Sequence, residues 1–586
     1  MKWRKTRNIY ISEFFRELAD ILEIKGESQF KVQAYRKAAE IIAGLGEDVG
    51  DLLASGALRN IKGIGGAIER KVDEILTTGK LTALEKARSE IPPGVVEMLR
   101  IPGIGPKTAR LLYEAAGIKG MDELESAIRD GKLDSIPGMG PSRVKRIKNG
   151  LDFIKGYGGR MLLSKALLMY DLVSQELKAI QGIREVAISG SARRMCEAVG
   201  DLDIVISADD VEDVKRRIMD RIPGVELSYF RSERISFELE RGVKVDISIT
   251  TPEEFPLILF FSTGSKKHVR RIVDLARSKG ISISEDGVGF EDGRRAKIEK
   301  EEDIYGIVGL DPIPAELRED RGEIEAASSG SLPKLLELGD IKGDLHCHTN
   351  WSDGSASLEE IVGAGRALGY RYIAITDHSE SLKVARGLSA DKLLKQVEMI
   401  RSMNEDLLGI KLLAGTEVDI LPDGSLDYPD DLLEKLDIVI ASVHTNFGMS
   451  RDEMTGRILK ALRNPYVDAI GHPTGRLIGE RAGYEVDIEE VLKEASRRGV
   501  FLELNAHHDR LDLNDRNLRL AKEMGVKIII GTDTHRLDNM GMMVLGVGTA
   551  RRGWLEPEDV VNTMDYDELL HLLRSRKMRA RGCEVR

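Results

Sequence analysis

The stretch Ser189-Gly-Ser-Ala-Arg-Arg-Met-Cys-Glu-Ala-Val-Gly-Asp-Leu-Asp203 begins where one apolar run ends and leads directly into a second. Side chains two residues apart on a strand point to the same face, so we expect Asp201 and Asp203 to project together. A later apolar run, residues 243–249, carries Asp246 at an alternating position. Three carboxylates on neighbouring strands predict an oxygen-rich site for two hard cations. Two such ions could stabilise the attacking and leaving oxygens of a phosphoryl displacement.

The turn before these aspartates carries groups suited to phosphate. Gly190 and Ser191 supply backbone N–H groups and a hydroxyl, and Arg193 and Arg194 supply positive charge. An isolated Asp-x-Asp pair would be interpreted as two ordinary polar residues at a strand end. The turn, the arginine pair and the later Asp246 occur together, and this combination favours a metal-dependent phosphoryl-transfer site.

These residues resemble the palm and thumb of family X DNA polymerases. The matching pattern is Gly190-Ser-x-Arg-Arg-x-x-Glu-x-x-Gly-Asp-x-Asp203, then Asp246, then Thr263-Gly-Ser265, and the resemblance extends over essentially the whole chain. It implies two Mg²⁺ or Mn²⁺ ions on the catalytic residues Asp201, Asp203 and Asp246. It also implies a nucleotide-binding set made of Gly190, Ser191, Arg194, Gly200 and Gly264.

Length and composition set the broad class. A chain of 586 residues exceeds what one core supports, so several domains are expected. No apolar run is long enough to span a membrane, and no secretory signal core follows the basic N-terminus. The three cysteines are scattered and odd in number, which favours a reducing cytoplasm over a disulfide framework.

Charge is distributed unevenly along the chain. The overall net charge is −11, but residues 1–160 carry a net charge of +6 and the remainder −17. A basic N-terminal region, residues 1–160, joined to an acidic remainder fits a DNA-binding region attached to a carboxylate-rich metal enzyme.

A short motif occurs three times in the basic N-terminal region. The copies are Ile61-Lys-Gly-Ile-Gly65, Ile101-Pro-Gly-Ile-Gly105 and Ile136-Pro-Gly-Met-Gly140, each lying between two helical stretches. This is the helix-hairpin-helix signature, in which glycine allows a tight turn and the following helix directs N–H groups at a DNA phosphate. Its grip is on the DNA backbone, so binding should be sequence-independent and salt-sensitive. The DNA-binding glycines are Gly63, Gly65, Gly103, Gly105, Gly138 and Gly140.

Three further residues of the basic N-terminal region match family X positions. Lys31 and Tyr35 match a lysine and a tyrosine that lie by the 5′-phosphate of gapped DNA; a solvated basic helix face is the alternative. Lys71 matches the lysine that forms a Schiff base in members with deoxyribose-phosphate lyase activity, whereas an exposed DNA-contacting lysine is the alternative. A neighbouring family lysine is replaced by Ala67.

The thumb region departs from the family pattern at two places. Phe261-Ser262 stands where the eukaryotic members carry an aromatic pair that crowds the sugar 2′-position, and Val269 stands where an asparagine often contacts the base edge. The sequence therefore predicts measurable ribonucleotide incorporation.

A second chemistry begins after residue 340, where nine of the ten histidines lie. Metal-competent side chains follow successive apolar runs that are separated by helical stretches, a pattern that predicts a parallel (β/α) barrel with its site at the carboxyl ends of the strands. The set resembles the PHP (polymerase and histidinol phosphatase) domain. The implied ligands are His346, His348, Asp353, His378, Glu417, His444, His472, Asp533 and His535. Such a mixed N/O set suits up to three Zn²⁺, Mn²⁺ or Fe²⁺ ions. Cys347 is expected in the core.

The predicted fold is multidomain: α-helical helix-hairpin-helix domains, an α+β nucleotidyltransferase palm and thumb, and a (β/α) barrel PHP domain. The expected bounds are 1–88 and 89–158 for the helical and fingers-like domains, 159–250 for the palm, 251–315 for the thumb, 316–340 for a linker and 341–586 for the PHP domain. The predicted function is gap filling in DNA repair, with 3′→5′ exonuclease, 3′-phosphoesterase and abasic-site incision activities implied for the barrel. The partners would be gapped or nicked duplex DNA and deoxynucleoside triphosphates, and the protein would be a monomer.

Two alternatives stay open at this point. The chain could be a DNA-end scaffold with a silent palm, against which the complete carboxylate set argues. It could instead be a phosphatase of a small phosphoester such as histidinol phosphate, against which the helix-hairpin-helix copies argue.

Overall fold

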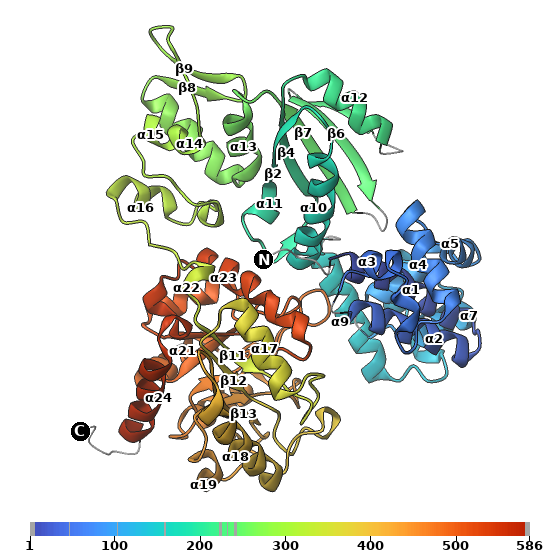
Figure 1. Cartoon of the computed structure of the whole chain (residues 1–586), viewed down its shortest axis with the longest axis vertical. Coiled ribbons are helices and arrows are strands. Elements are labelled where there is room, and N and C mark those ends of the chain that lie inside the picture. The colour runs from blue at the N-terminus through green and yellow to red at the C-terminus, as the bar shows by residue number, and fades with distance from the viewer. Residues whose placement is uncertain are drawn as a thin grey trace. The chain divides into compact units, whose positions relative to one another are not determined.

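The computed structural model describes residues 6–45, 47–101, 103–157, 160–221, 226–230, 232–239 and 243–580 (Figure 1). The chain divides into two compact units. The first consists of Met1–Arg160 with Leu168–Glu176 and Gly479–Arg481, and the second contains the other segments, up to Arg586. Pro102, inside the second helix-hairpin-helix copy, lies outside the described residues.

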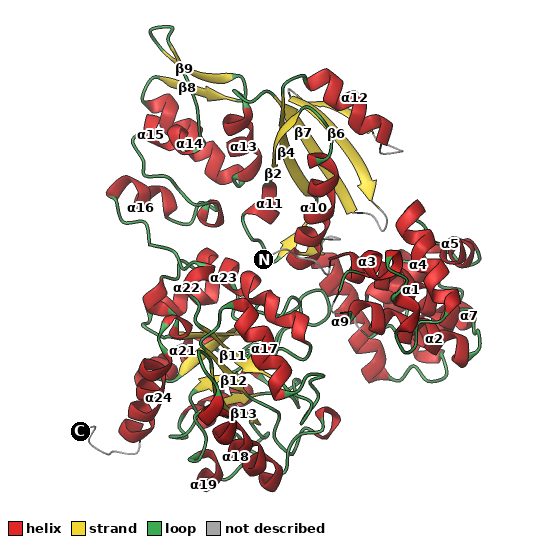
Figure 2. Ribbon diagram, viewed as in Figure 1, coloured by secondary structure: helices red, strands yellow, loops and turns green. Residues whose placement is uncertain are grey.

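The described residues of the segment 1–160 in the first unit form helices joined by turns and loops (Figure 2). Its elements are α1 (Thr6–Ile24), α2 (Gln29–Ala43), α3 (Val49–Ala54), η1 (Leu58–Asn60), α4 (Gly66–Thr78), α5 (Thr82–Ser89), α6 (Pro93–Glu97), η2 (Met98–Arg100), α7 (Pro106–Ala116), α8 (Met121–Arg129), η3 (Lys132–Ser135) and α9 (Pro141–Tyr157). One cluster of buried apolar residues runs from Ile11 to Leu151. The segments expected as separate domains at 1–88 and 89–158 thus share a core.

The three helix-hairpin-helix copies adopt the same local geometry. In each, the first glycine has a positive φ, +101° at Gly63, +90° at Gly103 and +85° at Gly138. Each turn is closed by one backbone hydrogen bond of 2.9–3.0 Å, as from Ile104 N to Ile101 O. Helices α4, α7 and α9 begin directly after the turns. Glycine is required at the first position because L-residues rarely adopt this conformation.

The palm of the second unit is a mixed five-stranded sheet in the order β2-β4-β7-β6-β5. The strands are β2 (Ile183–Ile188), β4 (Leu202–Ala208), β5 (Glu226–Phe230), β6 (Ser232–Leu239) and β7 (Val243–Thr250). β4 and β7 are parallel neighbours, and β2 and β6 flank them as antiparallel partners. The helices around this sheet in the sequence are α10 (Leu163–Lys178), the short α11 (Gly190–Arg193) and α12 (Val211–Arg221).

The thumb follows, and its core continues into the segment expected to be a linker. It contains α13 (Phe255–Thr263), α14 (Lys266–Ser278), β8 (Ile281–Ser284), β9 (Gly287–Phe290), β10 (Arg295–Ala296) and α15 (Glu302–Ile307). The segment 316–340 is not an extended connection, because it includes α16 (Glu323–Ser329). Leu317, Ile324 and Leu335 from this segment are buried against thumb residues such as Phe260. Its apolar side chains are too irregularly spaced to show a helical period, and tertiary packing orders them.

The C-terminal part is a nearly closed barrel of seven parallel strands in sequential order (Figure 1). The strands are β11 (Gly343–Cys347), β12 (Tyr372–Ile375), β13 (Lys411–Asp419), β14 (Ile438–Ser442), β15 (Ala469–Ile470), β16 (Phe501–Asn505) and β17 (Ile528–Gly531). A parallel bridge between Cys347 and Thr534 links the first strand to the chain just after the last. The barrel predicted from the apolar runs is confirmed.

Helices that follow the strands along the chain cover the barrel. They include α17 (Leu358–Leu368), α18 (Ala390–Asp406), α19 (Asp430–Leu433), α20 (Arg451–Leu462), α21 (Ile488–Arg498), α22 (Asp515–Glu523), α23 (Met543–Arg552) and α24 (Tyr566–Ala580). Cys347 is fully buried in the apolar cluster around the strands, as predicted. Among the described residues, no helix is both long and apolar enough to cross a membrane.

Candidate metal centres

The three palm carboxylates converge on β4 and β7, two inner strands of the sheet. Asp203 lies on β4 directly beside Asp246 on β7, and Asp201 immediately precedes β4. Ligand oxygens of the three side chains lie within 4.8 Å of one another. Asp246 is buried, whereas Asp201 and Asp203 are half-buried, so the site stays open on one side. Such a set of oxygens fits hard divalent cations.

Gly190 brings the turn that is expected to bind phosphate against these carboxylates. Its φ is +61°, and a Cβ atom there would lie 2.1 Å from Oδ2 of Asp203. Ser189 N also donates to Asp203 O at 2.9 Å. Only glycine fits this position, and Ser191 follows it at the start of α11.

The two arginines after the turn have different partners. Arg193 forms a bidentate pair with Glu301, at 3.1 and 2.7 Å, and donates to Thr263 Oγ1 at 2.6 Å. It therefore anchors the turn to the thumb, in contrast to the expectation that both arginines serve phosphate. Arg194 donates to Thr263 O at 2.8 Å, and its charge acts on Asp203. The Thr263-Gly264 turn thus lies beside Arg194.

Two of the expected nucleotide-binding glycines have different surroundings. Gly200 is exposed, with open space where a side chain would extend. A Cβ atom at Gly264 would lie 2.7 Å from Cγ2 of Val269. Gly264 is therefore required for packing at the start of α14, while Gly200 leaves the approach to the carboxylates clear.

Arg234 is a palm residue that the sequence interpretation missed. From β6, it donates to Asp203 Oδ1 at 2.9 Å and to Asp246 Oδ2 at 2.7 Å. Burial and the neighbouring Asp201 nevertheless raise the pKa of Asp203 to about 7. The carboxylates thus carry more negative charge than the protein neutralises, which is what a cation site requires. Only the pairing of β6 with β7 brings Arg234 here.

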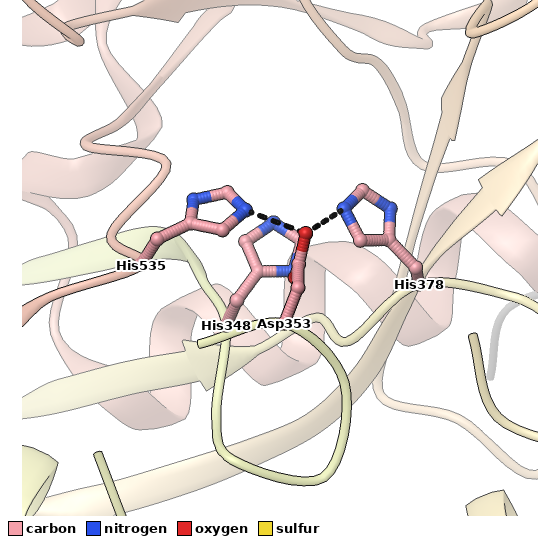
Figure 3. A group of neighbouring side chains, drawn as sticks. All are labelled: His348, Asp353, His378 and His535. Atoms are coloured by element: carbon pink, nitrogen blue, oxygen red, sulfur yellow. Dashed lines mark ion pairs between the residues drawn. The ribbon is translucent and has the colours of Figure 1, made fainter. Parts of the chain in front are cut away.

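The barrel brings all nine predicted ligands together at the carboxyl ends of its strands. Their side chains form three overlapping groups with ligand atoms within 4.8 Å, and His472 joins them through Nε2, 2.9 Å from Glu417 Oε1. In Figure 3, His378 and His535 point at Asp353 from two sides, at 3.6 and 3.2 Å, beside His348. His346 and His348 lie 3.1 Å apart between their Nε2 atoms. Two imidazoles this close can both face a cation.

Burial of the histidines and carboxylates in the barrel site makes their protonation depend strongly on neighbouring charges. Burial and the neighbouring His378 lower the pKa of His348 to about 3, so this imidazole is neutral. Nδ1 of His348 and Nδ1 of His472 are buried without a hydrogen-bond partner among the described residues. Neutral, unpartnered imidazole nitrogens beside carboxylates fit a transition-metal centre.

A surrounding set of carboxylates orients the ligands. Glu503 accepts from His346 Nδ1 at 2.6 Å and from His472 N at 2.6 Å, and Asp419 accepts from His444 Nδ1 at 2.5 Å. Such partners fix the ring orientation of metal-binding histidines. The sequence interpretation missed both, although a glutamate in the middle of the apolar run 501–505 was an available signal.

Seven of the nine candidate ligands line a cavity of about 250 Å³, together with one positively charged side chain. Arg510 borders the cavity and lies 3.3 Å from Asp533 Oδ2. Leu382, Val384 and Ala385 form an apolar rim, and Val384 is 92 % exposed. Metal-binding groups, an arginine and an apolar lip suit the phosphate and the base of one nucleotide.

The predicted DNA-binding residues lie in the first unit. Lys31 on α2 is exposed and lies 3.3 Å from Glu27, and Tyr35 stacks on Phe15 at 6.3 Å between ring centroids. Lys71 is half-buried on α4. At Gly65 and Gly105, open space surrounds the start of the following helix, so a phosphate could reach its N–H groups.

Family models match four parts of the chain. They are a helix-hairpin-helix domain over residues 6–81, a SAM-like helix-hairpin-helix tandem over 95–152, a DNA polymerase beta thumb over 258–319 and a PHP domain over 344–507.

Similarity to curated proteins covers nearly the whole chain. It is 38% identical over 560 residues to a DNA polymerase/3′-5′ exonuclease PolX of Bacillus subtilis, covering 95% of this chain and 97% of the relative. A probable phosphatase of a Thermoanaerobacter species is 33% identical over 252 residues, 41% of this chain and 98% of the relative. One from Acetivibrio thermocellus is 34% identical over 201 residues, 33% of this chain and 78% of the relative. The chain therefore belongs to the family X DNA polymerase/3′-5′ exonucleases of the PolX type, with helix-hairpin-helix domains, a polymerase beta thumb and a C-terminal PHP domain.

Proposed function

We propose that this protein fills short gaps during DNA repair and cleans the 3′ ends from which it extends. The observation that carries the proposal is the presence of two unlike metal-competent sites in one chain. One is an open trio of carboxylates beside the Gly190 turn, and the other is an enclosed set of nine ligands. Removal of a blocked or mismatched 3′ end leaves a 3′-hydroxyl, which is the nucleophile that the palm needs.

In the palm, two Mg²⁺ or Mn²⁺ ions would lower the pKa of the primer 3′-hydroxyl and neutralise charge on the triphosphate when bound. Asp201 and Asp203 would hold both, and Asp246 would complete the one nearest the primer. The 190–191 turn and Arg194 would hold the triphosphate. Catalysis by these groups would consist of positioning and charge neutralisation.

In the barrel, Zn²⁺, Mn²⁺ or Fe²⁺ would supply a hydroxide nucleophile at neutral pH when bound. Glu503 would keep His346 in a ligating orientation, and Arg510 would contact the phosphate to be cleaved. The apolar rim at Val384 would support the base of the 3′-terminal nucleotide. This arrangement supports 3′→5′ exonuclease action. Similarity of this region to probable phosphatases supports a second reaction there, removal of a 3′-phosphate.

The proposed partners are gapped or nicked duplex DNA and deoxynucleoside triphosphates. The three helix-hairpin-helix turns would hold DNA phosphates, with Lys31 and Tyr35 near the 5′-phosphate. A monomer suffices for these roles, because each proposed site is formed by residues of one chain.

A gapped duplex bearing a 3′-phosphate tests the proposal, incubated with and without nucleotides. We expect a 3′-hydroxyl product without nucleotides and a filled gap with them. If the protein hydrolyses histidinol phosphate but neither shifts nor processes the gapped duplex, it is a small-phosphoester phosphatase instead. If it binds the duplex without extending a 3′-hydroxyl primer in Mg²⁺ or Mn²⁺, it is a scaffold.

Two finer activities on abasic DNA rest on fewer residues. Incision at an abasic site would use the barrel centre, and a lyase reaction would use Lys71 as an amine nucleophile. Borohydride trapping on an incised abasic substrate tests the second. We expect an adduct that Lys71→Ala removes, and an adduct undiminished in that variant would assign the lyase elsewhere.

A further inference from the structure

A buried cluster of charged side chains joins the nucleotide-binding turn of the palm to the barrel. We call it the Glu319 cluster, and its members are Arg194, Glu319, Asp515 and Arg552. Arg552, at the end of α23, donates to Glu319 Oε1 at 3.0 Å and to Asp515 Oδ2 at 2.9 Å. Arg194 donates to the same Glu319 oxygen at 2.9 Å. One carboxylate is therefore shared by an arginine of the palm and an arginine of the barrel.

The cluster is withdrawn from solvent. The side chains of Arg552, Arg194 and Glu319 are 7%, 13% and 16% exposed. Burial works to raise the pKa of Glu319, but Arg194 and Arg552 outweigh it and hold the pKa below its ordinary value. Glu319 therefore stays ionised and needs a cation in every state of the protein, because an unpaired buried charge is strongly unfavourable.

Arg552 also holds the backbone of the turn. Its Nη1 donates to Arg194 O at 2.7 Å. The next residue, Met195, has a φ of +55° and packs against Gly548 of α23, where a Cβ atom would lie 2.2 Å from its Cε. A larger residue at this point of α23 would force the Met195 side chain to move. Backbone and side chain of the turn are thus both fixed by one barrel helix.

A second barrel arginine holds the far end of the same turn. Arg476 donates to Glu197 Oε2 at 2.7 Å and to Arg510 O at 2.9 Å. Arg510 borders the cavity of the barrel centre. The segment 194–197 is therefore held by the barrel at both ends.

We propose that Arg552 is a positioning residue for nucleotide binding in the palm, so that the PHP barrel completes the site at which the triphosphate is held. This rests on the proposed role of Arg194. Nε of Arg194 donates to Glu319 in the structure. When Arg194 turns toward a triphosphate, Glu319 keeps Arg552 as its partner, so no buried carboxylate is left unpaired. Without Arg552, Glu319 would retain Arg194 and compete with the triphosphate.

The test is steady-state filling of a one-nucleotide gap by Arg552→Ala, with excision of a 3′ mismatch measured on the same preparation. We expect the KM for the nucleotide to rise roughly tenfold, with kcat changed less, and the excision rate to stay at the wild-type value. Arg497→Ala is the matched control, because this exposed barrel arginine pairs within its own helix with Glu494. Arg552→Lys, which keeps the charge but loses the forked contact, should give a smaller rise in KM.

Further variants separate the inference from the function on which it rests. Arg194→Ala should raise the KM for the nucleotide; an unchanged KM would refute the role of Arg194 itself. If Arg194→Ala raises KM while folded Arg552→Ala and Arg552→Lys do not, the positioning role of Arg552 is wrong. In a Glu319→Gln background the effect of Arg552→Ala should shrink, because the competing charge is gone. If Arg552→Ala does not fold, Arg552→Lys decides, and a wild-type KM overturns the inference.

Discussion

The palm and the barrel solve the problem of holding divalent metals in opposite ways. The palm offers three carboxylates in a site that is open on one side, with Arg234 hydrogen-bonded to two of them. The barrel brings together nine candidate ligands, six of them buried, and buried Glu503 and Asp419 orient its histidines. Few hard ligands in an open site suit ions that arrive with the triphosphate. Many oriented nitrogen and oxygen ligands in a buried site suit ions that stay bound between turnovers.

The comparison also explains why both sites can work in one chain. Polymerisation needs the 3′-hydroxyl as a nucleophile, whereas excision needs a bound hydroxide directed at the same end of the primer. Separate centres allow each reaction its own metals and geometry. Breaking one site should therefore leave the other intact, and the following predictions run from the largest expected effect to the smallest.

The largest effect should follow Asp203→Ala. Loss of a carboxylate that would bridge both ions should lower nucleotide addition by about a thousandfold or more, because metal stabilisation of the transition state is worth several kcal/mol. Primer extension on a gapped duplex measures it. Asp209→Ala, a substitution at an exposed aspartate after β4, is the control. If Asp203→Ala extends the primer within tenfold of the wild-type rate, the palm carboxylates are not the site of nucleotide addition.

The converse effect should follow His348→Ala in the barrel. We expect 3′ excision to fall by about a hundredfold or more, since His348 contacts two of the three ligand groups, while extension of a matched primer stays at the wild-type rate. Release of a labelled 3′ nucleotide measures it, with the exposed His571→Ala as control. A parallel loss of extension would mean that the centres are not separable.

Metal removal should also distinguish the two sites, with a smaller effect than the two substitutions above. After dialysis against a chelator, extension should return as soon as Mg²⁺ is added, whereas excision should depend on ions that survived dialysis. Glu503→Gln should weaken barrel metal affinity by about 10–100-fold, because His346 loses its orienting carboxylate. Metal content by mass spectrometry reads this without an activity assay. Equal metal loss in wild type and variant would show that Glu503 does not support the centre.

The smallest effect concerns the helical unit, which should serve both reactions. Gly103→Ala places a side chain at φ +90° and should destabilise this unit by about 1 kcal/mol, while Gly105→Ala, at an ordinary φ and with open space around it, should cost less. Denaturant unfolding measures the difference. Weaker DNA binding by Gly103→Ala should raise the KM for DNA similarly in extension and excision; a change in only one would assign this motif to one site.

The sequence predicted most of both sites because their residues lie at strand ends, where alternation and run length are readable. Asp203 and Asp246 were predicted on neighbouring strands, and they are register partners. The nine barrel ligands converge as the resemblance implied. Residues whose role depends on long-range pairing could not be found this way. Arg234 reaches the palm only through the pairing of β6 with β7.

Charge pairing across domains was equally invisible in the sequence. Arg552 meets Glu319 across 233 residues, and no local pattern marks either side chain. The segment 316–340 was expected to be a linker because its glycines, prolines and serines suggested a connection, yet Ile324 and Leu335 pack into the thumb core. Composition describes local chain preference, whereas burial is decided by neighbours distant in the sequence.

The proposed repair reaction requires two separable centres that act on one primer end. The direct measurement is repair of a gapped duplex whose primer ends in a mismatched nucleotide, by Asp203→Ala, by Asp533→Ala and by an equal mixture of the two. We predict that the first variant excises without filling, that the second does neither at a normal rate, and that the mixture yields the filled product. Wild-type excision and filling by Asp533→Ala alone, or no excision by Asp203→Ala, would contradict the account.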